Sequence, residues 1–351
     1  MTRSFWRGKR VFLTGHTGFK GGWLALWLAD MGADVHGYAR TPPTIPSLFE
    51  VAGIDKRLSS NTIGDVRDAD TLASALHASN AEVVFHLAAQ PLVRRSYHDP
   101  IETFGSNVMG TVHVLDAIRS AGGVRCVVNV TTDKCYENRG GVAPFVETDP
   151  MGGHDPYSSS KGCSELVTDA YRRSFLATQG VRVASARAGN VIGGGDWADD
   201  RLVPDFLRAI DAGREIVIRS PEATRPWQHV LEPLSGYLRL AECLCEGGER
   251  FDGAWNFGPP PTEARSVRWI VERLCREVSG ARWSVTADPQ PHEAQFLSLD
   301  NTKAREQLAW SPRWSIETAL ARTVSWHRAW RSGEPMQDLC LAQVREYEGC
   351  A

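Results

Sequence analysis

RVFLTGHTGFKG, residues 10–21, decides the fold of this chain. Residues 10–14 form a short apolar run that ends at a glycine, which is typical of a buried parallel strand. Three glycines follow, and apolar residues spaced by three and four then predict a helix over residues 18–31. A strand, a glycine-rich turn and a helix in this order predict a dinucleotide site, because the helix N-terminus attracts a pyrophosphate.

Strand and helix patterns continue to alternate through the first half of the chain. Such alternation implies parallel pairing through right-handed crossovers. The fold class expected is therefore α/β, a doubly wound parallel sheet of the Rossmann type with a smaller C-terminal substrate-binding region. The further elements expected are strands at 34–38, 82–87, 125–130 and 181–186, one strand before Gly64, and helices at 100–120 and 155–178.

The pattern changes at GGGD, residues 193–196, beyond which the periodicity is less regular. We expect the dinucleotide-binding domain to occupy residues 1–190, with 228–258 returning to it. The substrate-binding region is then formed by 191–227 and 259–351.

Composition excludes several classes of protein. The 351 residues are 42% hydrophobic and 23% charged, with a formal net charge of −3 and no basic run, so no nucleic-acid partner is expected. No uncharged apolar stretch reaches about 18 residues, and the N-terminus lacks a secretory signal, so we expect no membrane partner and a cytoplasmic location. The eight cysteines are scattered without a C-x-x-C pair, which predicts reduced thiols and no metal site.

Two residues beyond the glycine-rich turn bear on the choice of cofactor. The acid that usually binds the ribose is missing after the second strand, where Arg40 stands instead. Arg40 is either a ligand of a 2′-phosphate, which would favour NADP, or a solvated loop arginine. Asp65 follows the third strand and either reaches the adenine or caps the next helix.

YSSSK, residues 157–161, places a tyrosine and a lysine four residues apart. This spacing puts both side chains on one face of a helix. An ammonium group near a phenol lowers the phenol pKa, so we expect Tyr157 to exchange protons near neutral pH with the help of Lys161.

Together with the glycine-rich turn, this motif resembles the short-chain dehydrogenase/reductase superfamily, in its extended branch that acts on nucleotide sugars. The resemblance implies NAD as the cofactor, with NADP as an alternative, and a nucleotide diphosphate hexose as the substrate. Thr132 matches the hydroxyl that hydrogen-bonds the oxygen being oxidised. The cofactor contacts expected are Gly15, Thr17, Gly18, Phe19, Gly21, Arg40, Asp65, Val66, Leu87, Ala88, Ala89, Gln90, Asn107, Tyr157 and Lys161.

The pair that follows Thr132, Asp133-Lys134, resembles the 4,6-dehydratases of this branch, in the form that acts on CDP-glucose. The alternative is a local surface ion pair. Other functions to be weighed are an epimerase, a dehydratase for GDP-mannose or dTDP-glucose, and a dinucleotide sensor without catalysis. Further segments share the resemblance: GHTGFKGG (15–22), SLFE (47–50), AAQPLV (88–93), AGNVIGGGDW (188–197) and RPWQHV (225–230).

A 4,6-dehydratase oxidises carbon 4 of the hexose, eliminates water across carbons 5 and 6, and returns the hydride to carbon 6. The resemblance implies that Tyr157, poised by Lys161, takes the proton of the carbon 4 hydroxyl. Asp133 would then be the acid at carbon 6 and Lys134 the base at carbon 5.

Substrate contacts are implied for four residues in the second half of the chain. Asn190 is expected to meet the sugar or the diphosphate, and Arg201 and Arg225 offer guanidinium forks that suit a diphosphate. His229 either touches the substrate or packs against Trp227. A homodimer is expected, because the predicted helices 100–120 and 155–178 match the pair that forms the dimer in this family.

Overall fold

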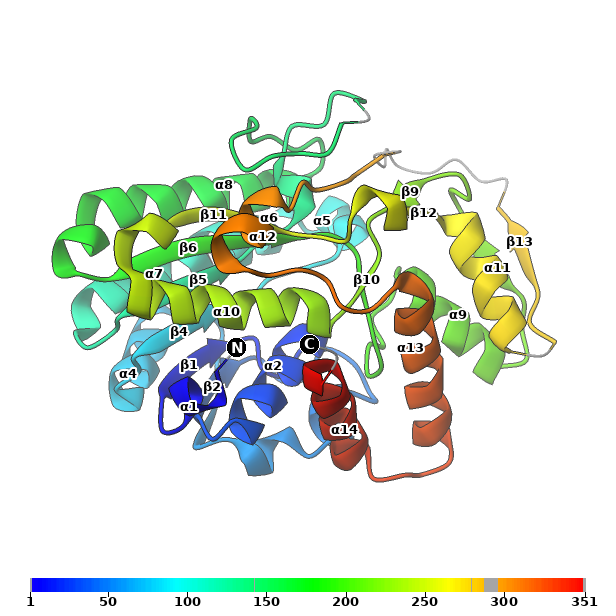
Figure 1. Cartoon of the computed structure of the whole chain (residues 1–351), viewed down its shortest axis with the longest axis horizontal. Helices are drawn as coiled ribbons and strands as arrows, with labels where there is room; N and C mark the ends of the chain where they lie inside the picture. The colour runs from blue at the N-terminus through cyan, green and yellow to red at the C-terminus, as the bar shows by residue number, and fades with distance from the viewer. Residues whose placement is uncertain (1, 142, 279, 287–295, 350–351) are drawn as a thin grey trace.

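The computed structural model describes residues 2–141, 143–278, 280–286 and 296–349. Its centre is a seven-stranded parallel sheet in the order β11-β6-β5-β4-β1-β2-β3 (Figure 1). This confirms the doubly wound α/β fold. The strands are β1 (Arg10–Thr14), β2 (Asp34–Ala39), β3 (Ser60–Ile63), β4 (Val83–His86), β5 (Cys126–Val130), β6 (Arg182–Ala188) and β11 (Gly253–Phe257).

Alternate side chains of the strands enter two separate cores, because successive residues of a strand point to opposite faces. Val11 and Leu13 belong to one core, whereas Phe12 belongs to the other. The first core includes residues of α2 (Phe19–Asp30) and α10 (Leu231–Gly247). The second includes residues of α4 (Ala69–Ser79), α7 (Gly110–Ala121) and α8 (Pro156–Tyr171).

Two predicted helices are interrupted by π-helical turns. The expected helix 100–120 is divided into α6 (Pro100–Phe104), the turn η2 (Gly105–Met109) and α7. The expected helix 155–178 begins where the carboxylate of Asp155 caps the N–H of Ser158, but α8 ends at Tyr171 and the turn η4 (Arg172–Leu176) follows. Such turns are invisible to a search for a constant helical period.

The smaller region lies beside the sheet, on the right of Figure 1. It has its own apolar core, which includes Phe206, Ile270 and Leu320. Its longer helices are α9 (Leu202–Asp211), α11 (Val267–Glu277) and α13 (Ile316–Arg331). Its strands pair as β7 (Val191–Ile192) with β10 (Gln228–His229), β8 (Ile216–Ile218) with β13 (Trp283–Val285), and β9 (Thr224–Arg225) with β12 (Arg265–Ser266).

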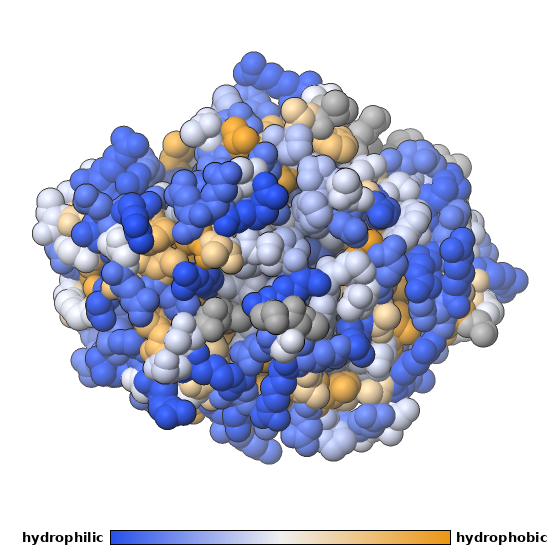
Figure 2. All heavy atoms as spheres, in the orientation of Figure 1, coloured by the Kyte–Doolittle hydropathy of each residue, from blue (hydrophilic) through white to orange (hydrophobic). Residues whose placement is uncertain are grey.

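Short helical segments complete the chain. They are α1 (Arg3–Trp6), α3 (Leu48–Val51), η1 (Ile54–Arg57), α5 (Val93–His98), η3 (Asp133–Cys135), η5 (Ala177–Gln179), η6 (Gly248–Phe251), η7 (Pro261–Glu263) and α12 (Thr302–Leu308), and the longer helix α14 (Met336–Gly349) follows them. Across the described residues, no helix is both long and apolar enough to span a bilayer. Figure 2 shows a mainly hydrophilic face on which apolar residues form small, separate patches.

A buried carboxyl group attaches the C-terminal helix α14 to the rest of the molecule. Glu232 of α10 is fully buried and accepts hydrogen bonds from the backbone N–H groups of Arg313 and Trp314. The hydroxyl of Tyr347, on α14, donates to the same carboxyl group at 2.6 Å and lies 3.0 Å from the hydroxyl of Ser235. Helix α14 therefore packs beside α2, although the two are at opposite ends of the chain (Figure 1).

Tyr347→Phe should lower the free energy of unfolding by about 1–3 kcal/mol, because it leaves a buried carboxyl oxygen without one of its donors. Urea denaturation monitored by circular dichroism measures this change. Tyr97→Phe is the control, since Tyr97 is 41% exposed and its replacement should change the free energy by less than about 0.5 kcal/mol. Equal stabilities of the two variants would show that the Glu232 network does not anchor α14.

Candidate active site

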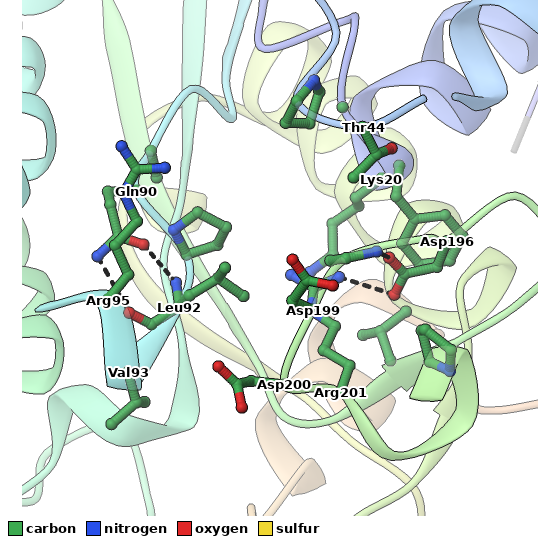
Figure 3. A pocket seen from close by; sticks show the side chains of 18 of the residues that line it. Lys20, Thr44, Gln90, Leu92, Val93, Arg95, Asp196, Asp199, Asp200 and Arg201 are labelled. Carbon is green, nitrogen blue, oxygen red and sulfur yellow. Dashed lines mark hydrogen bonds and ion pairs between the residues drawn. The ribbon is translucent and has the colours of Figure 1, made fainter. Parts of the chain in front are cut away.

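A cavity of about 840 Å³ opens at the C-terminal edge of the sheet and reaches the smaller region. Ligands of open α/β sheets bind at this edge. In Figure 3, Gln90 and Arg95 lie on one side of the cavity, and Lys20 and Arg201 lie on the other. Within the described residues, no three His, Cys, Asp or Glu side chains cluster as metal ligands would.

The glycine-rich turn lines one end of the cavity and has room only for glycine at two positions. Gly15 has φ +81°, and a Cβ atom there would lie 2.8 Å from the backbone nitrogen of Ala88. A Cβ atom at Gly21 would lie 2.1 Å from the carbonyl oxygen of Gly15. The turn around Gly18 leads directly into the N-terminus of α2. The turn and this helix N-terminus together form a cradle that fits the pyrophosphate of a dinucleotide.

Arg40 and Asp65 both line the cavity, but each already has an ionic partner. Arg40 pairs with Glu102 at 2.7 Å, and its Nε atom is 3.9 Å from Asp65. Arg67 donates to both carboxylate oxygens of Asp65, and this lowers the Asp65 pKa. A 2′-phosphate beside Arg40 would therefore meet two carboxylates.

Most of the other expected cofactor contacts also line the cavity. They are Thr17, Phe19, Val66, Leu87, Ala88, Ala89 and Gln90. Asn107 does not line it. Its amide is buried, accepting from the backbone N–H of Gln90 at 2.8 Å and donating to the Ser160 hydroxyl at 2.9 Å. Asn107 thus positions Gln90 against helix α8.

The structure brings the five expected catalytic residues together where β5 and α8 meet. Thr132, Lys134, Tyr157 and Lys161 line the cavity. Asp133 lies behind them and is fully buried. Its Oδ1 atom accepts from the Thr132 hydroxyl at 3.0 Å and is 3.6 Å from the Lys134 ammonium, whereas its Oδ2 atom has no hydrogen-bond partner among the described residues.

The expected lowering of the tyrosine pKa is wrong for this arrangement. Burial raises the pKa of Tyr157 to about 12, although a hydrogen bond with Thr132 and the charge of Arg201 oppose the shift. Burial also lowers the pKa of Lys161 to about 8, against the charge of Glu165. The Lys161 ammonium donates to the Val130 carbonyl at 3.2 Å. The loss of hydration raises the Tyr157 pKa more than a neighbouring ammonium group would lower it, because both side chains are shielded from water.

A buried ion pair joins helix α8, which carries two of the catalytic residues, to strand β6. Glu165 of α8 pairs with Arg187 of β6 at 2.7 Å, and each side chain is at most 5% exposed. The hydroxyls of Thr131 and Ser185 also donate to Glu165. Arg187 in turn donates to the hydroxyl of Tyr136 at 2.7 Å. This network fixes α8 relative to the ends of β5 and β6.

The candidate substrate contacts divide into two groups. Asn190, Arg201 and Arg225 line the cavity, and Arg201 pairs with Asp196 at 2.8 Å. His229 is not part of the lining.

The ring of His229 is fully buried and lies against the rings of Trp23 and Trp314. Burial lowers its pKa to about 3. The structure therefore places His229 in the apolar core, because its aromatic neighbours enclose it, and not at the surface that a substrate would touch.

Sequence reasoning missed Lys20, which lines the cavity next to the catalytic residues. Its ammonium donates to the Tyr237 hydroxyl at 3.3 Å. Burial lowers its pKa to about 7, helped by the charges of Arg201 and Lys161 and opposed by Asp133. A cation inside the glycine-rich turn, directly before its third glycine, was the signal in the sequence.

Residues 11–252 match the NAD dependent epimerase/dehydratase family, and this chain belongs to that family. The chain is 51% identical to the CDP-glucose 4,6-dehydratase of Salmonella typhimurium over 98% of both chains. It is 26% identical to a dTDP-glucose 4,6-dehydratase of Xanthomonas campestris, over 90% of this chain and 92% of that one.

Among solved structures, the dTDP-glucose 4,6-dehydratase DesIV of Streptomyces venezuelae, with NAD and TYD bound, is 27% identical. It matches with a TM-score of 0.79 over 93% of this chain and 99% of that one. A UDP-glucose 4-epimerase of Thermotoga maritima, at 22% identity and a TM-score of 0.79 over 92% and 99% of the two chains, shares the fold.

The stability of the unliganded protein should rise between about pH 7 and pH 9. Folded Lys20 loses its proton at about pH 7, whereas the unfolded side chain, with its ordinary pKa of 10.5, keeps it. The unfolded state then binds more protons, and one such proton gives a slope of about 1.4 kcal/mol per pH unit. Lys20→Met should flatten this slope, measured by urea denaturation across the pH range.

Lys161 contributes in the same direction above about pH 8, so some slope should remain in that variant. Lys56→Met is the control, because Lys56 is exposed and does not line the cavity. An unchanged slope in Lys20→Met would contradict the assignment of a neutral amine to folded Lys20.

Proposed function

We propose that this chain catalyses the 4,6-dehydration of CDP-D-glucose to CDP-4-keto-6-deoxy-D-glucose, with NAD as the cofactor. The observation that carries the proposal is the meeting of Thr132-Asp133-Lys134 with Tyr157 and Lys161 at the sheet edge. The similarity to the Salmonella enzyme along nearly the whole chain supports the choice of nucleotide and reaction.

The residues present fit NAD better than NADP. The glycine-rich cradle suits a pyrophosphate, and NAD dependence is the property after which the family is named. Glu102 and Asp65 lie beside Arg40, so the two negative charges of a 2′-phosphate would be repelled there. A ribose hydroxyl carries no such charge.

NAD, when bound, supplies the redox chemistry by accepting a hydride from carbon 4 and giving it to carbon 6. Thr132 holds the carbon 4 hydroxyl and Tyr157 accepts its proton. The high pKa of Tyr157 makes its phenolate costly, and the hydrogen bond with Thr132 and the charge of Arg201 reduce that cost.

The ketone at carbon 4 acidifies the proton on carbon 5. Lys134 lines the cavity and acts as the base that removes this proton. Asp133 is proposed as the acid toward the departing hydroxyl of carbon 6. It is buried directly behind Thr132 and Lys134, and its Oδ2 atom has no hydrogen-bond partner among the described residues. These roles require a neutral Lys134 and a protonated Asp133 before the step, and the step leaves an ammonium and a carboxylate, the ion pair that the structure shows at 3.6 Å.

Asn190, Arg201 and Arg225 are proposed as the substrate contacts, with the two guanidinium groups directed to the diphosphate. Accordingly, residues 1–190 and 228–258 would hold the cofactor. Residues 191–227 and 259–351 would hold the nucleotide sugar, although α14 within this stretch packs beside α2 of the cofactor domain. Part of the stretch lies outside the described residues.

We also propose a homodimer. Apolar side chains are exposed on α6, η2 and α8, which contact one another: Ile101 is 85% exposed, Leu166 62% and Met109 47%. A second copy would cover them, and sedimentation equilibrium tests this assembly.

A cytoplasmic location is proposed because the seven cysteines in the described ranges are free thiols, and Cys350 lies outside those ranges.

Deuterium placed on carbon 4 of CDP-glucose should appear on carbon 6 of the product. The reaction in deuterated water should instead label carbon 5, since Lys134 exchanges its proton with solvent. Mass and proton spectra of one incubation distinguish the alternatives. An epimerase would return deuterium to carbon 4 and keep the carbon 6 hydroxyl, and a sensor would move no label. Either of these results would refute the proposed reaction.

Asp133→Asn and Lys134→Met should stop product formation at different steps. In Asp133→Asn the base remains, so the carbon 5 proton should exchange with deuterated water while the carbon 6 hydroxyl stays. In Lys134→Met carbon 5 should stay unlabelled. Each loss should be about 10²–10⁴-fold in rate. Arg139→Met, at an exposed residue, is the control and should turn over normally. Exchange at carbon 5 in Lys134→Met would show that another group is the base.

A further inference from the structure

Two thiols from distant positions in the chain meet at the end of β5 opposite to the catalytic residues. Cys126 is the first residue of β5, and Cys245 lies in the last turn of α10. Their Sγ atoms are 3.0 Å apart, and both are free thiols. A disulfide bond is about 2.05 Å long, so the sulfurs need to approach by only about 1 Å.

The two thiols have different access to solvent. Cys126 is fully buried, and its Sγ atom lies 3.7 Å from the Ala241 carbonyl. Cys245 is partly exposed and lines a surface hollow of about 390 Å³, whose wall also includes Arg125 and Arg182. A small oxidant can therefore reach Cys245, whereas Cys126 is accessible only through its neighbour.

The hydrogen bond between the two thiols, together with nearby cations, favours a thiolate on Cys245. The hydrogen bond from Cys126 lowers the Cys245 pKa first, and the charges of Arg125 and Lys9 lower it further, while burial and Glu82 oppose them. The pKa of Cys126 is raised, by its bond to Cys245 and by burial. Thiolates are the reactive form of cysteine, so the accessible thiol is also the more nucleophilic one.

We propose that Cys245 and Cys126 form a peroxide-sensitive pair, in which Cys245 is oxidised first and Cys126 resolves it into a reversible disulfide between α10 and β5. This site is separate from the proposed dehydration, and its test does not depend on that function.

The oxidation balances with a hydroperoxide as the only oxidant. The Cys245 thiolate attacks one oxygen of hydrogen peroxide, the O–O bond breaks, and Cys245 sulfenic acid and hydroxide form; the hydroxide takes a proton from the solvent and leaves as water. The sulfur of Cys126 then attacks the sulfenic sulfur. The S–O bond breaks, and the hydroxide leaves as water with the Cys126 proton. The two thiols lose two electrons in total, and the peroxide gains them.

The disulfide would close a loop of 119 residues. Cross-linking a loop of this size restricts the unfolded chain and should raise the melting temperature by about 4 °C or more. Because Cys126 begins β5 and the catalytic residues follow its last residue, the cavity should keep its shape. Oxidation is therefore expected to change the turnover of the full chain less than twofold.

The test treats the wild-type protein with hydrogen peroxide at a few equivalents and maps the peptides by mass spectrometry. The expected results are a link between the peptides of Cys126 and Cys245, loss of two free thiols, the rise in melting temperature, and reversal of all three by dithiothreitol. Unlinked Cys126 and Cys245 that are both still alkylated after treatment would overturn the proposal without any variant.

Variants assign the order of oxidation. In Cys126→Ser, dimedone should trap a sulfenic acid on Cys245, and peroxide should not raise the melting temperature. In Cys245→Ser, Cys126 should stay unmodified. Cys275→Ser is the matched control, because Cys275 is also partly exposed on a helix but its pKa is raised by burial, and it should behave as wild type. Dimedone labelling of Cys275 before Cys245 would contradict the proposed reactivity.

Discussion

The buried ion pair between Glu165 and Arg187 is the interaction on which the rest of the site depends. It joins α8, which carries Tyr157 and Lys161, to β6. Through the Thr131 hydroxyl it also reaches the end of β5, directly before Thr132. Removing one partner of such a pair leaves an uncompensated buried charge and typically costs about 3–5 kcal/mol. The geometry of the catalytic groups is therefore fixed by charges that never touch a ligand.

Positive charge dominates the cavity above this pair. Lys161 and Arg201 approach Lys20 closely enough for their charges to lower its pKa, and the charge of Asp133 opposes them. Burial and mutual repulsion favour neutral lysines in the unliganded protein. A ligand with a diphosphate group would reverse this balance, because its negative charges stabilise the protonated amines. Binding and protonation are thus coupled in this cavity.

Strand β5 has the proposed catalytic residues at one end and the proposed redox-active thiol at the other. Its last residues lead to Thr132 and the carboxyl group of Asp133, where the proposed proton transfers occur. Its first residue is Cys126, whose thiol meets Cys245 of α10. Helix α10 also contributes Tyr237, which accepts from Lys20 on the cavity side. The helix that would be linked by oxidation is therefore also the one that provides the hydroxyl partner of Lys20.

Periodicity and motif spacing alone determined the class of the fold, because strand alternation, a glycine-rich turn and a tyrosine–lysine pair are local patterns. They correctly predicted the parallel sheet, the cradle formed by Gly15 and Gly21, and the lysine and tyrosine on one face of α8. The roles assigned to those side chains stay predictions until the variants are measured.

Only the tertiary structure decided burial and long-range partners. It raised the pKa of Tyr157 against the sequence expectation, enclosed His229 between tryptophans, and brought Lys20 to the catalytic residues. It also joined two cysteines that are 119 residues apart. Local sequence carries none of this, because desolvation and hydrogen-bond partners arise from segments that meet only when the sheet and its covering helices have packed.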